Sequence, residues 1–233
     1  MKYGRYIAVG GGQCADLITV RGLNRLQTAD LILYDRLADE ALLQGVAAEK
    51  VLVGKVPYRH SVSQEEINAI LVANLQEGKT VVRLKGGDSL LFSRVAEEIA
   101  AARTVGAEIE IVPGVTTAST AMAKVESALT DREHASGVIF ITGHSKEGLL
   151  PAYDWAHIAK SKLTLVIYMG VKNIAAIVQA LIDNGLSMDT PILAAESVGS
   201  TEERYTVSTV GEFNAVDGFA TPSLFVIGRV LNG

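Results

Sequence analysis

The sequence has one cysteine, no long apolar run and no excess of positive charge, and each absence narrows what the protein can be. With Cys14 alone the chain cannot form an internal disulfide, which fits the reducing cytosol. The longest apolar runs fall far short of the roughly 20 residues that cross a bilayer, and residues 1–9 lead straight into strand-like sequence rather than a signal peptide. The formal net charge of −5 argues against general nucleic-acid binding, which usually needs a basic face. We therefore expect a cytoplasmic protein with neither a membrane nor a nucleic-acid partner.

What the sequence does contain is typical of a globular α/β protein. Of its 233 residues 48% are hydrophobic and 20% are charged, without like-charge blocks, low-complexity segments or internal repeats. In the first half, strand-like and helix-like segments alternate, which predicts a mostly parallel sheet with helices on its faces. The expected strands are residues 6–9, 31–34, 51–53, 81–84 and 108–112, and the expected helices are 16–29, 64–77 (with Ser63 as N-cap) and 94–105.

The pattern changes after Pro113 and Gly114, where strands become more frequent than helices. This ratio predicts a mixed or antiparallel sheet. The expected helices here are residues 116–125 and 171–184, the expected strands are 137–142, 162–168, 192–196, 203–209 and 223–228, and residues 143–154 are expected to form a loop. We therefore expect an N-terminal α/β domain over residues 1–117 and a C-terminal α/β domain over residues 118–233, with a ligand cleft between them.

The segment that follows the strand at 81–84 has the composition of a ligand site. Lys85 is followed by Gly86, Gly87 and Asp88. Adjacent glycines let the main chain approach a ligand and adopt dihedrals that a side chain forbids, and Asp88 can accept hydrogen bonds from hydroxyl or amino groups. Taken alone, the same residues also fit a tight strand-to-helix turn.

The first strand ends in a glycine-rich turn with two interpretations. Gly10, Gly12 and Ala15 satisfy the pattern G-x-G-x-x-A, and Asp35 ends the next strand about 20 residues on, as in dinucleotide-binding folds. The alternative is a tight strand exit. Nothing downstream resembles a hydride-transfer site, so an NAD- or NADP-dependent oxidoreductase is the weaker hypothesis.

Taken together, the motifs resemble the uroporphyrinogen-III C-methyltransferases of the tetrapyrrole methylase family over nearly the full chain. The residues that carry the resemblance occur in order: Val9-Gly10-x-Gly12, Tyr34-Asp35-Arg36, Val53-Gly54-Lys55, His60, Arg83-Leu84-Lys85-Gly86-Gly87-Asp88, Pro113-Gly114-Val115-Thr116, Leu129-Thr130-x-Arg132, Thr142-Gly143-His144 and Tyr168-Met169-Gly170. The resemblance implies two α/β domains, S-adenosylmethionine as the methyl donor, and a homodimer.

The implied reaction transfers two methyl groups to C2 and C7 of uroporphyrinogen III, giving precorrin-2 for sirohaem or cobalamin. The general base implied by the family falls on Asp35 and the general acid on Lys55. The implied cofactor residues are Gly10, Gly12, Gln13, Gly86, Gly87, Asp88, Leu91, Thr116, Thr117, Met169 and Val198. A sulfonium methyl needs little activation, so the protein mainly has to place a pyrrole carbon in line with it and remove one proton.

A tetrapyrrole substrate with many carboxylates needs a local basic lining in this acidic protein. Arginine suits this role because it can hold a carboxylate in a bidentate fork. We expect Arg21, Arg36, Arg59, His60, Arg94 and Arg132 to bind substrate, and Arg83 and Lys85 belong to the same basic group near the motifs. His134 and His157 have no metal-ligand spacing, so no metal is expected.

Several positions depart from the family pattern. The first loop, at Gln13, Cys14 and Ala15, is one residue shorter and lacks both prolines, and Gln13 stands nearest to the proline that touches the cofactor. Ser89 replaces a proline, Val198 replaces a glycine, and Asp131 replaces a histidine. Such changes alter loop shape. Two alternatives therefore stay open: a tetrapyrrole- or cofactor-binding homologue with impaired catalysis, and a precorrin methylase acting at another ring position.

Overall fold

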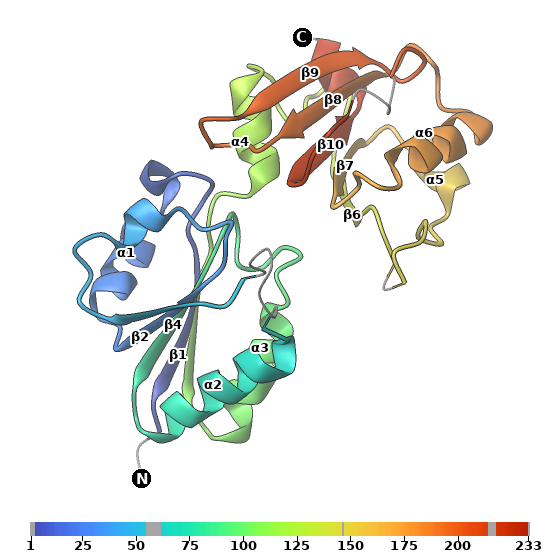
Figure 1. The fold of residues 1–233 in the computed structure, drawn as a ribbon. Helices are drawn as coiled ribbons and strands as arrows, with labels where there is room; N and C mark the ends of the chain where they lie inside the picture. The colour runs from blue at the N-terminus through green and yellow to red at the C-terminus, as the bar shows by residue number, and fades with distance from the viewer. Residues whose placement is uncertain (1–2, 55–61, 146, 214–217, 233) are drawn as a thin grey trace. The chain divides into compact units, whose positions relative to one another are not determined.

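The computed structural model describes residues 3–54, 62–145, 147–213 and 218–232. The chain forms two compact units, Met1–Thr116 and Thr117–Gly233 (Figure 1). Each unit has its own sheet and its own hydrophobic clusters, so each is described by itself.

The first unit is built on a sheet of five parallel strands in the order β3-β2-β4-β1-β5. The central strands are buried on both faces, as their runs of valine, isoleucine and leucine predict. The strands are β1 (Arg5–Gly10), β2 (Leu31–Tyr34), β3 (Glu49–Leu52), β4 (Thr80–Lys85) and β5 (Glu108–Val112). Because all five run the same way, their carboxyl ends lie at one edge of the sheet.

Helices cover both faces of this sheet (Figure 1). On one face α1 (Val20–Gln27) and the 3-10 helices η1 (Ala15–Leu17) and η2 (Glu40–Leu43) pack over Ile7, Ile32 and Val82. On the other face α2 (Gln64–Gln76) and α3 (Val95–Thr104) pack over Tyr6, Leu33 and Val81. Helix α2 begins with a capping box, in which Ser63 accepts from the Glu66 N–H and Glu66 accepts from the Ser63 N–H.

The second unit has a mixed five-stranded sheet in the order β6-β7-β10-β8-β9. Strands β6 and β7 pair in parallel, and every other pair is antiparallel. The strands are β6 (Val138–Thr142), β7 (Thr164–Tyr168), β8 (Pro191–Glu196), β9 (Arg204–Thr209) and β10 (Ser223–Ile227). This pairing makes β6, β7 and β8 run in one direction, so their carboxyl ends share one edge of the sheet.

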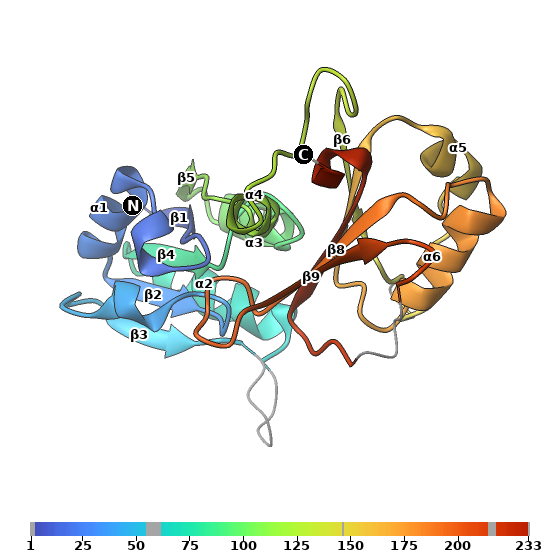
Figure 2. The ribbon, with the colours of Figure 1, turned by 90° about the horizontal axis from the view of Figure 1, so that it is seen from above.

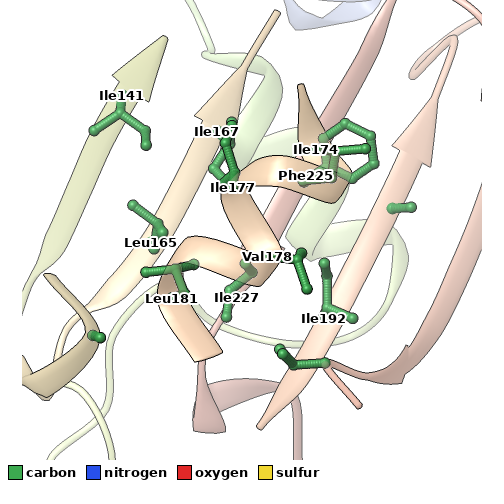
Figure 3. Packing of buried hydrophobic residues seen from close by; sticks show 13 residues of the cluster. Ile141, Leu165, Ile167, Ile174, Ile177, Val178, Leu181, Ile192, Phe225 and Ile227 are labelled. Atoms are coloured by element: carbon green, nitrogen blue, oxygen red, sulfur yellow. The ribbon is translucent and has the colours of Figure 1, made fainter. Parts of the chain in front are cut away.

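Two apolar layers enclose this sheet. Figure 3 shows Ile174, Ile177 and Leu181 of α6 (Ile174–Asp183) packed against side chains of β6, β7, β8 and β10. Helix α5 (Trp155–Lys160) lies beside α6 on that face, as Figure 2 shows. On the opposite face, α4 (Thr117–Lys124) and the 3-10 helix η3 (Arg229–Asn232) cover Val166, Leu193 and Val226.

The predicted fold class, α/β with a parallel sheet followed by a mixed one, is confirmed. The helix expected over 16–29 is wrong in its start: Asp16 lies in η1, and α1 begins only after Thr19, whose hydroxyl accepts from the Gly22 N–H. The helix expected over residues 171–184 is α6, which begins three residues further along, at Ile174. Helix α5 was not predicted, although Asp154 caps it through the His157 N–H. Within the described residues, no helix has both the length and the apolar character needed to cross a membrane.

Candidate functional site

Glycines bring the loops after β1, β4 and β5 into contact at the carboxyl edge of the parallel sheet. A Cβ on Gly114 would lie 2.3 Å from the Gly87 carbonyl oxygen and 2.7 Å from the Gly10 carbonyl carbon. A Cβ on Gly10 would lie 2.6 Å from the Gly114 nitrogen. Real Cβ atoms do not approach backbone this closely, so only glycine allows this convergence.

Backbone hydrogen bonds hold the first and fourth strand exits together. Gly12 donates to the Gly87 carbonyl at 3.2 Å and accepts from the Gly87 N–H at 2.7 Å. Gly11 donates to the Lys85 carbonyl at 2.8 Å. A Cβ on Gly86 would lie 2.3 Å from the Leu37 carbonyl, so the loop after β2 joins the group. The immediate role of these glycines is thus to pack four loops against each other.

The residues after Gly87 leave polar and apolar groups at the surface. One carboxylate oxygen of Asp88 accepts from the Leu90 N–H at 2.9 Å in an Asx turn, and Leu91 donates to the Asp88 carbonyl. Leu90 and Phe92 are exposed although they are large and apolar. A half-buried carboxylate beside exposed apolar groups is a suitable surface for a ligand with both hydroxyls and rings.

Unusual backbone conformations gather in loops that follow strand carboxyl ends. Among the described residues, five non-glycine residues have positive φ, and four of them lie in such loops: Phe92 (51°), Arg94 (59°), Met169 (55°) and Ser197 (49°). The left-handed region costs roughly 1–2 kcal/mol for such residues, and retained strain is common at ligand sites. By this criterion the candidate ligand-binding loops are the one after β4 in the first unit and those after β7 and β8 in the second.

Asp35 comes directly after β2, at the carboxyl edge of the first sheet. Its Oδ1 accepts from the Leu37 N–H at 3.1 Å, and its Oδ2 lies 3.4 Å from a guanidinium nitrogen of Arg83. The side chain is 26% exposed, so the carboxylate is held by the protein yet open to a ligand. Gly54, after β3, packs against the Asp35 backbone, where its Cβ would lie 3.3 Å from the Asp35 Cα.

Arg83 and Lys85 are not part of a substrate funnel, and that prediction is wrong. Both side chains are buried on the α2/α3 face and pair with the fully buried Glu98, at 3.2 and 2.8 Å. Tyr6 donates to the second Glu98 oxygen at 2.7 Å. Burial, followed by the nearby charge of Arg83, lowers the pKa of Lys85. Burial, followed by the charge of Glu98, raises the pKa of the Tyr6 hydroxyl.

Sequence reasoning did not single out Glu98. The signal was present: Val81, Arg83 and Lys85 alternate on one face of a central strand, where two charges need a buried counter-charge.

The residues expected to bind substrate are exposed wherever the structure describes them. Arg21 is in the first turn of α1, Arg36 follows Asp35, and Arg94 precedes α3 and holds Glu97 in a bidentate pair at 2.7 Å. Arg132 lies in the second unit, before β6. Lys55, Arg59 and His60 fall outside the described residues.

The second unit repeats the glycine arrangement at the shared carboxyl edge of β6, β7 and β8. A Cβ on Gly143 would lie 2.3 Å from the Gly170 Cα, so the loops after β6 and β7 touch through glycines. Between them, the His144 ring nitrogen Nδ1 lies 3.2 Å from the Met169 carbonyl oxygen. Met169 is 45% exposed, so a large, polarizable residue lies at the surface of this loop.

The other cofactor candidates of this region have diverse environments. Val198 is buried in the core with Ala118 and Ala121 of α4. Thr116 closes the first unit, and Thr117 is the first residue of α4. The Tyr168 hydroxyl accepts from the Ala118 N–H at 3.2 Å and so helps to anchor the start of α4.

The first loop does not have the geometry of a dinucleotide-binding turn. That turn leads directly into a helix whose N–H groups hold a pyrophosphate. Here the half-buried Gln13 and Cys14 are followed by only a short 3-10 helix, and α1 starts at Val20. The Ala15 N–H donates to Asp39 at 2.9 Å. The alternative of a tight strand exit is the better description.

One cavity lies apart from these loops. It has a volume of about 380 Å³ and is found in the second unit among Ala135, Lys162, Leu186 and Gly228, where β6 and β7 begin. None of the predicted site residues lines it. In the described part of the chain, no cluster of three His, Cys, Asp or Glu side chains is arranged to hold a metal ion.

Comparison with known proteins shows the family of the chain. The model of the Tetrapyrrole (Corrin/Porphyrin) Methylases matches residues 6–214, most of the chain. The chain belongs to the tetrapyrrole methylase family.

Solved structures extend the likeness over nearly the whole chain. A uroporphyrin-III C-methyltransferase from Thermus thermophilus, in complex with S-adenosylhomocysteine, is 33% identical with a TM-score of 0.83, covering 98% of this chain and 99% of that one. A cobalt precorrin-4 methyltransferase is 27% identical with a TM-score of 0.85, covering 98% and 96%.

Curated relatives are closer in sequence and longer. Siroheme synthase 1 of Cronobacter sakazakii is 42% identical over 98% of this chain and 49% of its own length. The siroheme synthase of Sodalis glossinidius is 43% identical over 99% of this chain and 50% of its own length. This chain therefore spans about half the length of the curated relatives it matches.

Proposed function

We propose that the chain transfers methyl groups from S-adenosylmethionine to C2 and C7 of uroporphyrinogen III, giving precorrin-2 for sirohaem or cobalamin. The observation that carries this proposal is Asp35, a partly exposed carboxylate fixed at the carboxyl edge of a parallel sheet, beside loops that only glycines can pack. The end-to-end likeness to a uroporphyrin-III C-methyltransferase supports the choice of substrate.

The residues of the strand-exit loops fit the proposed methyl donor. When bound, S-adenosylmethionine supplies a positively charged sulfonium whose methyl group transfers readily to carbon. Asp88 has a second carboxylate oxygen for ribose hydroxyls, and the exposed Met169 can pack on an adenine. Leu91, Thr116, Thr117 and the backbone at Gly10, Gly12, Gln13, Gly86 and Gly87 complete the proposed cofactor set, and Val198 acts on it through the packing of α4.

Asp35 is the proposed base. Methylation of a pyrrole carbon leaves one surplus proton, and a carboxylate held by two partners can accept it without moving. Lys55 is the proposed acid. The exposed guanidinium groups of Arg21, Arg36, Arg94 and Arg132, with Arg59 and His60, are proposed to hold the acetate and propionate groups of the substrate.

We further propose that the protein works as a homodimer in the cytoplasm, as the family resemblance and the single cysteine suggest. Light scattering on the purified protein gives the mass directly, and a monomer at micromolar concentration would contradict the dimer.

The test is anaerobic incubation with uroporphyrinogen III and S-adenosylmethionine, followed by product mass and absorbance. The proposal expects two added methyl groups and the spectrum of precorrin-2. Methylation of a precorrin but not of uroporphyrinogen III would favour another ring position. Tetrapyrrole binding without any methylated product would favour the binding homologue, which the shortened first loop motivates.

A further inference from the structure

We propose that Glu98 is a positioning residue: through Arg83, this fully buried carboxylate fixes the carboxylate of Asp35. The inference rests on the proposed function, in which Asp35 removes a proton. It concerns a group that would touch neither substrate nor cofactor, because Glu98 has no exposed side-chain surface.

Glu98 is held on both of its oxygens. Oε1 accepts from Arg83 Nε at 3.2 Å, from Lys85 Nζ at 2.8 Å and from the Gln64 amide at 3.4 Å. Oε2 accepts from the Tyr6 hydroxyl at 2.7 Å. The donors come from β1, β4 and α2, so the carboxylate joins three elements at one point.

Arg83 connects Glu98 to Asp35 at the carboxyl edge of the sheet. Its NH1 donates to the carbonyl oxygens of Leu33 and Leu84 at 3.2 and 2.9 Å, and its NH2 lies 3.4 Å from Asp35 Oδ2. The planar guanidinium is therefore fixed along its length by Glu98, by the backbone of two strands and by Asp35. Such a fork has little freedom to swing when a ligand contacts Asp35.

Solvent exposure of the side chains increases from Glu98 to Asp35. The side chains of Glu98, Lys85 and Arg83 are 0%, 4% and 6% exposed, whereas that of Asp35 is 26% exposed. Formal charge balances within the group, with two cations (Arg83 and Lys85) and two carboxylates (Glu98 and Asp35). A balanced, largely buried group whose most exposed member is Asp35 serves to place that carboxylate, since a 1 Å error in a reacting group costs about 100-fold in rate.

The experiment compares variants of the full chain in the anaerobic methylation assay. Glu98→Gln keeps the shape but leaves the two buried cations with one fewer counter-charge. Glu98→Gln with Lys85→Met restores charge balance while still replacing the charged acceptor of Arg83 with a neutral amide, so it remains informative if the single variant folds poorly. Glu110→Gln is the matched control, because Glu110 also pairs with two arginines, Arg5 and Arg25, away from the site.

We expect Glu98→Gln and the charge-balanced double variant to lower kcat by about 10- to 100-fold with KM changed less than about twofold. Both variants should bind S-adenosylhomocysteine as tightly as the wild type does. Glu110→Gln should have the kcat and KM of the wild type. In an Asp35→Ala background, adding Glu98→Gln should cost little further, because both changes disable the same group.

Two results would overturn the proposal. One is a wild-type kcat in the variant that combines Glu98→Gln with Lys85→Met. The other is that Glu98→Gln lowers kcat as much in the Asp35→Ala background as in the wild type. A wild-type protein without turnover would defeat the proposed function itself, and the same assay reveals this before any variant is compared.

Discussion

At the scale of single residues, Asp131 shows how backbone N–H groups stabilise the ionised form of a carboxylate. Its carboxylate accepts from the N–H groups of His134, Glu133 and Ala135, and the His134 ring lies at 2.8 Å. These bonds, that of the His134 N–H first, lower the pKa of Asp131 from 3.8 to about 2.

The lowered pKa predicts how acid affects stability. Because the folded value lies below the unfolded one, the Asp131 contribution is complete above about pH 4 and is lost as pH falls through about 2. The difference in unfolding free energy between wild type and Asp131→Asn should therefore shrink over that window. A carboxyl-carbon NMR titration, assigned with the same variant, checks the pKa; a midpoint near 3.8 would contradict the account.

Asp35→Ala separates proton removal from cofactor binding. We expect turnover with uroporphyrinogen III to fall by about 100-fold or more, because a general base typically contributes that much. Affinity for S-adenosylhomocysteine should stay within about twofold. Glu40→Ala, which removes an exposed carboxylate five residues further along the chain, is the control. Unchanged turnover in Asp35→Ala would remove Asp35 from the mechanism.

At this scale the sequence predicted which residue types lie at the strand exits, but it did not predict the surroundings of Arg83 and Lys85. Residue type, order and the family resemblance predicted Asp35 and Asp88 as site carboxylates; both follow strands of the first sheet, and their roles stay predictions. Arg83 and Lys85 were misjudged because a charged residue on a strand is usually exposed. Only the fold reveals that Glu98, contributed by α3, neutralises them.

At the scale of elements, the start of α2 depends on a reciprocal cap. Ser63 Oγ accepts from the Glu66 N–H at 3.1 Å, and Glu66 accepts from the Ser63 N–H. Ser63→Ala should lower the free energy of unfolding by about 1 kcal/mol. Ser63→Thr keeps the hydroxyl and should lower it much less. Urea unfolding measures both, and equal losses would show that the cap contributes nothing.

Gly114→Ala tests the packing of the strand-exit loops. Its new Cβ would meet the backbone of Gly87 and Gly10 at 2.3 and 2.7 Å, and backbone cannot yield as a side chain can. We expect a stability loss of about 1–3 kcal/mol, together with at least about tenfold weaker S-adenosylhomocysteine binding. Gly137→Ala is the control, because its Cβ meets only the end of the Leu163 side chain, at 3.1 Å. Wild-type affinity in Gly114→Ala would contradict the packing argument.

Elements were predictable where local signals agreed with tertiary packing. The Ser63 N-cap and the apolar spacing predicted α2, and the valine-rich run predicted β4. The start of α1 was missed because apolar spacing begins at Leu17, whereas the Thr19 cap decides where the helix starts. Helix α5 has only six residues, too short for periodicity to appear.

At the scale of the whole molecule, two sheets with different strand directions use the same device. Each unit brings its strand-exit loops together through glycines, Gly10, Gly87 and Gly114 in one and Gly143 and Gly170 in the other. The change from parallel to mixed pairing followed from the frequency of strands along the chain. The loop contacts did not, because they join residues far apart in sequence.

The central proposal is that the strand-exit loops of the first unit, including the shortened one at Gln13, bind a methyl donor. Calorimetric titration with S-adenosylhomocysteine, run in parallel with NAD, tests it most directly. The account predicts micromolar binding of S-adenosylhomocysteine and none of NAD. Absence of S-adenosylhomocysteine binding by the folded protein would contradict it.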